Sequence, residues 1–117
     1  MQPLDLLILN ATCDDWENLS SIRDSVASSP QSGPVEEAVL KSSLLPLVQQ
    51  GLLAAYEFKA GNFIRLAPDD ISMKAIPHLW YYITQAGRGM LDANEAFFVD
   101  SRGATGTRVL SAERPPR

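Results

Sequence analysis

The stretch WYYITQAGRGMLDANEAF, residues 80–97, passes within two positions from strand-forming to helix-forming sequence. Aromatic and β-branched residues fill its beginning, which is typical of a strand. The hydroxyl of Thr84 can then cap a helix whose apolar residues continue at helical spacing. We therefore predict a strand over residues 78–84, a helix from there to about Asp100, and close backbone packing at Gly87.

Three further helices are predicted before this junction. The first covers residues 3–11, begins with Pro3 and is apolar nearly all round, as expected of a helix surrounded by its own domain. In the second, Asp14 or Asp15 is the predicted cap. Its predicted apolar stripe is Trp16, Leu19, Ile22 and Val26. The polar loop of residues 28–34 ends this helix.

The third helix is predicted to start at Pro34, a favourable first helical residue. Its spacing predicts a buried face of Leu40, Leu44, Leu47 and Val48, and an opposite face of Glu37, Lys41, Ser42, Leu45 and Gln49. Pro46 lacks an N–H group, so we expect a kink there or a fresh last turn. Gly51 is the predicted end of the helix.

Two more strands are predicted between the third helix and the junction. Alternation predicts a strand over residues 52–58, and a turn leads to a second over residues 63–66. Residues 67–77 read as an irregular excursion bounded by prolines. In the junction strand, Trp80 and Tyr82 lie on the face opposite Leu79, Tyr81 and Ile83. That aromatic face is either an exposed interface or covered by the excursion.

The order of these elements resembles the winged helix-turn-helix domains of bacterial transcriptional regulators of the MarR and PadR type. Two motifs carry the resemblance: the helix end from Leu47 to Leu52, and the junction that contains Tyr81, Ile83, Thr84, Gly87 and Arg88. The resemblance implies an α+β fold with a three-helix core, a small antiparallel β-sheet forming the wing, and a C-terminal fourth helix. It covers about residues 3–100. We predict a winged-helix domain over residues 1–100 and a flexible basic tail over residues 101–117.

The resemblance also implies that the chain binds duplex DNA. The third helix would place Lys41, Ser42 and Gln49 near bases, while Lys59, Arg65 and Arg88 would lie near phosphates. Related regulators dimerise through terminal helices, so we predict a homodimer built from the first and fourth helices, with Phe97 and Phe98 as interface residues. The alternative is a winged-helix protein–protein interaction module that does not bind DNA, with Trp80 and Tyr82 in its interface.

The charge distribution limits the DNA hypothesis. The formal net charge is −4. Residues 1–60 carry eight acids and three bases, a net −5, and the rest carries six acids and seven bases, a net +1. The overall charge of the chain is therefore not expected to attract nucleic acid or an anionic membrane. Any surface that binds phosphates must come mainly from the C-terminal half.

The remaining signals indicate no enzyme. Cys13 is the single cysteine, which indicates a reducing, cytoplasmic setting. A nucleophilic pair of Cys13 and His78 would depend on an accidental approach in the fold, so no catalytic residue is predicted. Neighbouring acids suit caps and turns, and no spacing typical of a metal or cofactor site occurs. The apolar run Leu4–Leu9 is too short to span a membrane and is predicted to lie in the core.

Overall fold

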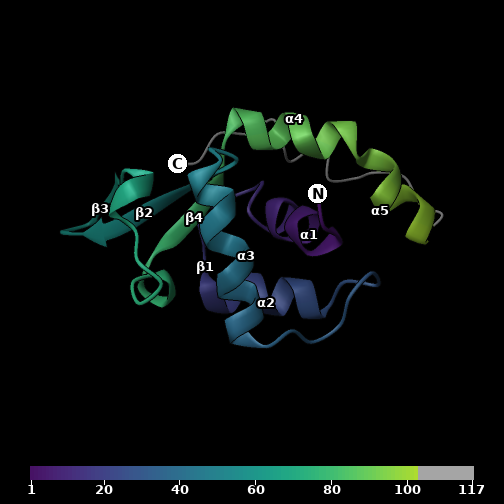
Figure 1. Cartoon of the computed structure of the whole chain (residues 1–117), viewed down its shortest axis with the longest axis horizontal. Helices are drawn as coiled ribbons and strands as arrows, with labels where there is room; N and C mark the ends of the chain where they lie inside the picture. The colour runs from purple at the N-terminus through teal and green to yellow at the C-terminus, as the bar shows by residue number, and fades with distance from the viewer. Residues whose placement is uncertain (103–117) are drawn as a thin grey trace.

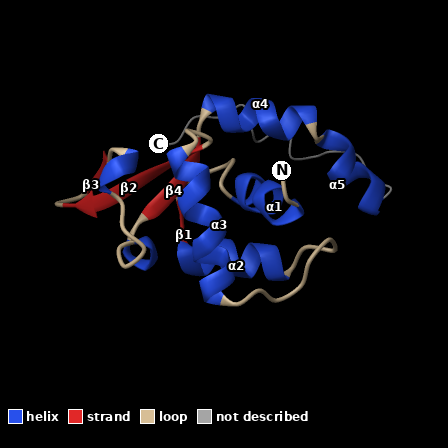
Figure 2. Cartoon of the chain, in the orientation of Figure 1, coloured by secondary structure: helices blue, strands red, loops and turns tan. Residues whose placement is uncertain are grey.

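The sheet and the helices occupy opposite ends of the molecule (Figures 1 and 2). The computed structural model describes residues 1–102, except for the side chains of residues 99–102. Within this range the chain is α+β, and the arrangement is compatible with a winged helix. Apart from its first two residues, the predicted tail 101–117 lies outside the described residues.

The helical end is built around α1 (Pro3–Ala11), as its apolar sequence predicts. The other helices are α2 (Leu19–Ala27), α3 (Glu37–Gln49), α4 (Gln85–Ala93) and α5 (Glu95–Arg102). Helix α1 contacts α2, α3 and α4, and its four residues from Leu6 to Leu9 are all buried. The predicted buried face of α3 is confirmed, since Leu40, Leu44, Leu47 and Val48 are all in the core. No helix within residues 1–102 is both long enough and apolar enough to cross a membrane.

The sheet has four antiparallel strands in the order β1-β4-β2-β3. They are β1 (Glu17–Asn18), β2 (Leu53–Lys59), β3 (Asn62–Arg65) and β4 (Trp80–Ile83). A two-residue turn of Ala60 and Gly61, both with positive φ, joins β2 to β3 and pairs Phe58 with Phe63. Strand β4 pairs with the inner part of β2, so β2 lies between β3 and β4.

The strand-to-helix junction forms at Thr84 as predicted, but the strand before it begins at Trp80 and not at residue 78, because His78 lies in a 3-10 turn. The Thr84 hydroxyl accepts a hydrogen bond from the Gly87 N–H at 3.1 Å and donates one to the Gly51 carbonyl at 2.6 Å. Gly51, with φ of 79°, ends α3, and the Leu52 N–H donates to the Leu47 carbonyl at 3.0 Å. Thr84 therefore joins the start of α4 to the end of α3.

The predicted start of the second helix is wrong. Helix α2 begins at Leu19, and the Asn18 side chain caps it by accepting from the Ser21 N–H at 2.9 Å. Asp15 instead accepts from the N–H of Trp16 at 2.8 Å, so Trp16 precedes the helix. The physical reason is that Glu17 and Asn18 pair with β4, which keeps this segment extended.

The predicted start of the third helix is also wrong. Helix α3 begins at Glu37 rather than Pro34, because Glu36 is extended with ψ of 147° and the Val35 carbonyl accepts a bond from Arg23 Nε at 2.9 Å. No fresh turn begins at Pro46, which lies inside one helix. The Ser42 carbonyl loses its helical donor there, but Ser42 is exposed and water can replace the donor.

The predicted single helix from Thr84 to Asp100 is divided in two at Asn94. The Asn94 side chain donates to the Met90 carbonyl at 2.8 Å, and its backbone leaves helical geometry with φ of −117° and ψ of 27°. A side-chain amide can compete with the backbone in this way for helical carbonyls. Helix α5 therefore begins anew at Glu95.

The excursion between β3 and β4 packs on the core side of the sheet. It contains two short 3-10 turns, η1 (Pro68–Asp70) and η2 (Ile76–His78). Ile71 and Ile76 are buried, and the Tyr81 hydroxyl donates to the Ile76 carbonyl at 2.8 Å. Tyr81 lies on the opposite face of β4 from Trp80 and Tyr82. The excursion therefore packs against the Tyr81 face of the sheet.

Candidate functional site

The residues predicted to contact DNA bases lie on α3 as expected, but the basic one is engaged. Lys41 is 3.8 Å from the Glu37 carboxylate. Ser42 and Gln49 are exposed. The exposed residues of α3 are Glu37, Ala38, Val39, Ser42, Pro46 and Gln49. The one charged side chain among them is the acid Glu37, so these exposed residues offer no electrostatic attraction to phosphates.

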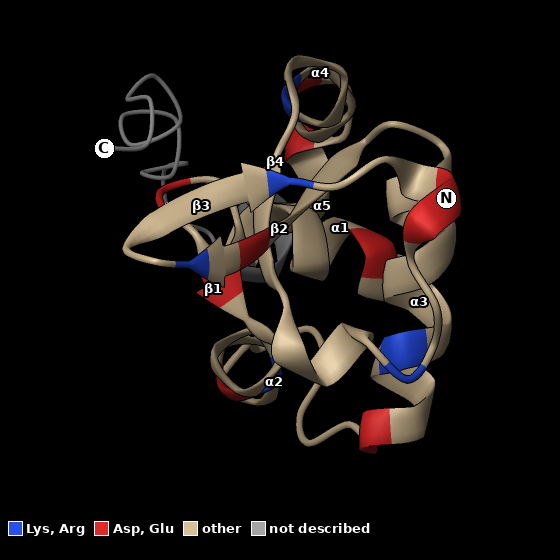
Figure 3. Ribbon diagram, turned by 90° about the vertical axis from the view of Figure 1, so that its left-hand side faces the viewer, with Lys and Arg blue, Asp and Glu red and all other residues tan. Residues whose placement is uncertain are grey.

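The predicted phosphate contacts are dispersed. Lys59 is 3.6 Å from the Glu57 carboxylate. Arg88 donates a hydrogen bond to the Tyr82 hydroxyl, and its guanidinium carbon lies 5.3 Å from the centre of that ring. Arg65 is exposed at the end of β3. Figure 3 shows the basic positions as separate segments with acidic segments between them. The structure therefore does not gather these cations into one surface.

The two aromatic residues predicted at an interface belong to a larger group of rings on the same face of the sheet. We call it the aromatic face, and its six members are Trp16, Tyr56, Phe58, Phe63, Trp80 and Tyr82. The sheet register accounts for it, because Tyr56 is paired with Trp80, and Phe58 with Phe63. Directly paired residues in an antiparallel sheet point to the same side.

Phe63 is the hub of the aromatic face. Its ring stacks on Trp16 with 4.1 Å between centres and an interplanar angle of 12°. It also contacts Phe58 at 4.9 Å and Trp80 at 5.8 Å. Tyr82 is buried beneath these rings, whereas Phe58 is 53% exposed. The face is therefore a packed aromatic layer with an exposed margin along the β2–β3 hairpin.

Burial also changes the acidity of Tyr82. Loss of solvent around its hydroxyl raises its pKa, and the neighbouring Arg88 opposes that rise. Trp16, at the same end of the aromatic face, has a buried indole N–H with no acceptor among residues 1–102. The Trp16 indole N–H is thus buried without an acceptor, whereas the Tyr82 hydroxyl accepts from Arg88.

The outer edge of β3 carries free backbone groups. The Leu66 N–H donates to the Ala55 carbonyl at 2.9 Å. Because bonded pairs alternate along an antiparallel ladder, the next bonded pair joins Glu57 and Ile64. The N–H and C=O groups of Phe63 and Arg65 therefore point outward, and within residues 1–102 no strand pairs with them. This edge and the exposed margin of the aromatic face adjoin each other.

The phenylalanines predicted for a dimer interface both pack at the core. Phe98 is 8% exposed and belongs to the core, and Phe97 packs against it as a partly buried side chain. Their rings meet edge to face at 5.1 Å. Both phenylalanines therefore belong to one apolar cluster at the core.

Cys13 and His78 were not predicted to form a catalytic pair, and the structure places one in the core and the other on the surface. Cys13 is 3% exposed, and His78 is exposed at the end of η2. Across the described part of the chain, no three His, Cys, Asp or Glu side chains form a group that could hold a metal ion.

Sequence reasoning missed Trp16, Tyr56, Phe58 and Phe63 as members of the aromatic face. A signal existed for Phe58 and Phe63, since a two-residue turn at Ala60 and Gly61 makes them a cross-strand pair. For Trp16 the signal was Asn18, which is an equally good cap and would have freed Trp16 from the helix.

Comparison with known proteins gives no relative. No family matches this chain, and neither a curated protein nor a solved structure shows significant similarity to it.

Proposed function

We propose that this chain is a winged-helix protein–protein interaction module that binds an extended segment of a partner along strand β3. The observation that carries the proposal is the outer edge of β3, with its free backbone groups, beside the exposed margin of the aromatic face. An extended peptide can add a strand to such an edge, where main-chain bonds give affinity and alternate side chains give specificity.

The side chains of β3 define the chemistry of the partner segment. Residues of an added strand opposite Phe63 and Arg65 are two positions apart and point to the aromatic face. An apolar side chain suits the position opposite Phe63. A carboxylate suits Arg65, which is exposed and forms no hydrogen bond or ion pair with a described residue. The residue between them faces the side of Ile64, which is 45% exposed, and is apolar.

The proposal predicts that a Thr-rich peptide with Glu-Val-Phe at its centre binds the protein. Arg65→Glu is expected to weaken binding by about tenfold, because it replaces an attraction with a repulsion worth roughly 1.4 kcal/mol. Fluorescence anisotropy of the labelled peptide measures the affinity. Exchanging the peptide Glu for Lys is expected to restore binding to the variant, which a merely structural role of Arg65 would not do.

Lys74→Glu is the matched control, because it makes the same charge change at an exposed residue of the excursion. It is expected to leave the affinity within about twofold. Absence of peptide binding to the wild type, or equal weakening by both variants, would remove the edge of β3 from the proposal.

Duplex DNA binding as a homodimer is the second candidate. Its support is the exposure of Ser42 and Gln49 on one stripe of α3, together with the exposed Arg65 in the hairpin. Hydroxyl and amide side chains can pair with base edges. Against it stands the charge of residues 1–98, where twelve acids and six bases leave a net −6.

Titration of a labelled random-sequence duplex separates the two candidates. We expect no change in anisotropy at low salt, because a net negative domain releases few counterions from DNA. Binding that weakens steeply between low and moderate salt would contradict this expectation and favour the second candidate. In that case Arg65→Glu should reduce the affinity, and Lys74→Glu serves again as the control.

The homodimer stays a prediction in either case. The apolar residues of α1 from Leu6 to Leu9 are already buried within the chain, so we expect any dimer contact to come from elsewhere. Of the two phenylalanines predicted at the dimer interface, Phe97 on α5 is the more exposed, because it is only partly buried.

A further inference from the structure

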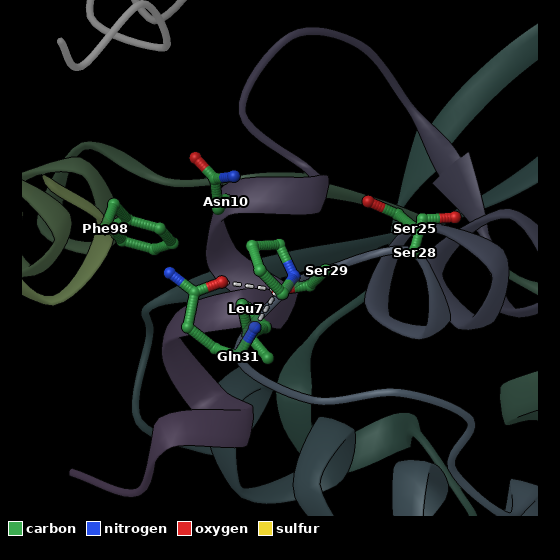
Figure 4. Close-up of a pocket in the computed structure, with 8 residues that line it drawn as sticks. Leu7, Asn10, Ser25, Ser28, Ser29, Gln31 and Phe98 are labelled. Carbon is green, nitrogen blue, oxygen red and sulfur yellow. Dashed lines mark hydrogen bonds between the residues drawn. The ribbon is translucent and has the colours of Figure 1, made fainter. Parts of the chain in front are cut away.

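The helical end of the molecule is tied together by contacts within the chain. A small pocket there, drawn in Figure 4, lies between α1, the loop after α2 and α5. Its polar wall is engaged: the Ser29 hydroxyl donates to the Gln31 side-chain oxygen at 2.6 Å, and the Gln31 amide nitrogen donates to the Phe97 carbonyl at 3.3 Å. The exposed backbone edge of β3 lies at the opposite end of the molecule (Figure 1).

The outward backbone groups of β3 have a self-complementary spacing. The N–H and C=O groups of Phe63 and Arg65 point outward, and Ile64 lies midway between these two residues. Two β3 strands can therefore pair antiparallel around a two-fold axis at Ile64, with Phe63 of each copy opposite Arg65 of the other. In this register both residues of each opposed pair direct their backbone groups at the other strand. Each pair can then exchange two N–H···O=C bonds.

The side chains of β3 fit the same register. Ile64, which is 45% exposed, meets Ile64 of the second copy at a position without backbone bonds, where opposed side chains come closest. On the aromatic face, Arg65 of one copy lies beside the ring of Phe63 of the other, which is a favourable contact between a cation and an aromatic ring. Self-pairing thus covers exposed apolar surface and brings no like charges directly opposite each other.

We propose that the partner at β3 is a second copy of this chain, which joins two sheets edge to edge around a two-fold axis at Ile64. The inference rests on the edge that carries the proposed function. It adds a competition, because a second copy that occupies the edge must leave before a peptide can bind there. Pairing over so short a strand gives a small interface, so we expect a reversible dimer with a Kd on the order of 100 µM.

Sedimentation equilibrium of the wild type between about 10 and 500 µM should show monomer and dimer in exchange. Ile64→Lys and Ile64→Glu each place two like charges directly opposite across the axis, so either variant alone should associate about tenfold more weakly. An equimolar mixture of the two variants should form a heterodimer at least about fivefold tighter than either homodimer, because the opposed charges then attract. Association in the mixture also shows that both variants fold.

Val39→Lys and Val39→Glu are the matched controls, because Val39 is 49% exposed and lies on α3, away from the β3 edge. Alone or mixed, they should leave the association within about twofold of the wild type. A monomer at every concentration, undiminished association of Ile64→Lys, or no gain in the mixture of the Ile64 variants would overturn the proposal.

Peptide binding and self-association are measured separately, so the two proposals can fail independently. A chain that binds the peptide and stays monomeric would overturn self-pairing and leave the proposed function standing. A chain that dimerises through Ile64 and binds no peptide would support self-pairing and overturn the peptide partner. If both proposals hold, addition of the peptide should convert the dimer to monomer in the same sedimentation experiment.

Discussion

Gly87→Ala is expected to destabilise the fold by about 3 kcal/mol, because the added methyl group has no space. A Cβ at this position would collide with the Leu52 carbonyl oxygen and lie 2.6 Å from Ile83 Cγ1. The Ile83 side chain can rotate, but the Leu52 carbonyl is fixed by the Thr84 N–H, which donates to it at 3.2 Å. Urea unfolding followed by circular dichroism measures the free energy of unfolding of each protein.

Gly89→Ala is the control for this substitution. Gly89 lies in the same helix, α4, and a Cβ there would meet nothing within 4 Å. Alanine favours a helix over glycine by about 1 kcal/mol, so we expect Gly89→Ala to be neutral or stabilising. If Gly87→Ala instead matched Gly89→Ala, α4 would not approach the end of α3 as closely as the structure has it.

The junction around Gly87 was predictable from sequence because its determinants are local. Thr84 and Gly87 lie within one helical turn, and the spacing of buried leucines marks α3 in the same way. The start of α2 was not predictable, because it depends on the pairing of Glu17 and Asn18 with β4, more than 60 residues away. Two residues carry too little periodicity to indicate a strand.

The candidate site was predictable only in part, for a similar reason. Trp80 and Tyr82 could be assigned to one face from the alternation of β4. Phe63 becomes the hub only when the register of the β2–β3 hairpin and the position of Trp16 are both known. These relations are set by tertiary packing.

Local spacing could have reduced the number of basic residues predicted to contact DNA. Glu37 and Lys41 are four residues apart on a helix, which predicts their ion pair. Glu57 and Lys59 point to the same side of one strand. Two of the predicted DNA contacts were thus already partnered in the sequence pattern.

Alkaline pH is expected to destabilise the protein through Tyr81. Its side chain is fully buried, and that burial raises the pKa of the phenol well above its ordinary value. Above a pH of about 10, the unfolded chain releases the phenolic proton while the folded chain keeps it. The folded state then binds more protons, so the stability present below pH 10 is lost at about 1.4 kcal/mol per pH unit as pH rises.

Tyr81→Phe tests this assignment through the slope of stability against pH. At neutral pH the variant should be less stable by about 1–2 kcal/mol, because the Ile76 carbonyl loses the Tyr81 hydroxyl that donates to it at 2.8 Å. Urea unfolding between neutral pH and about pH 11 should nevertheless show a smaller loss of stability in Tyr81→Phe than in the wild type.

Tyr82→Phe is the matched comparison for the pH slope. Burial also raises the pKa of Tyr82, but Arg88 beside its hydroxyl lowers it, so this variant should flatten the slope less than Tyr81→Phe does. Identical slopes for the wild type and Tyr81→Phe would show that the phenol of Tyr81 is not buried in its neutral form. The phenol of Tyr81 links β4 to the excursion through Ile76. The slope of stability against pH therefore reports whether residues 67–77 pack on the core side of the sheet, away from the aromatic face.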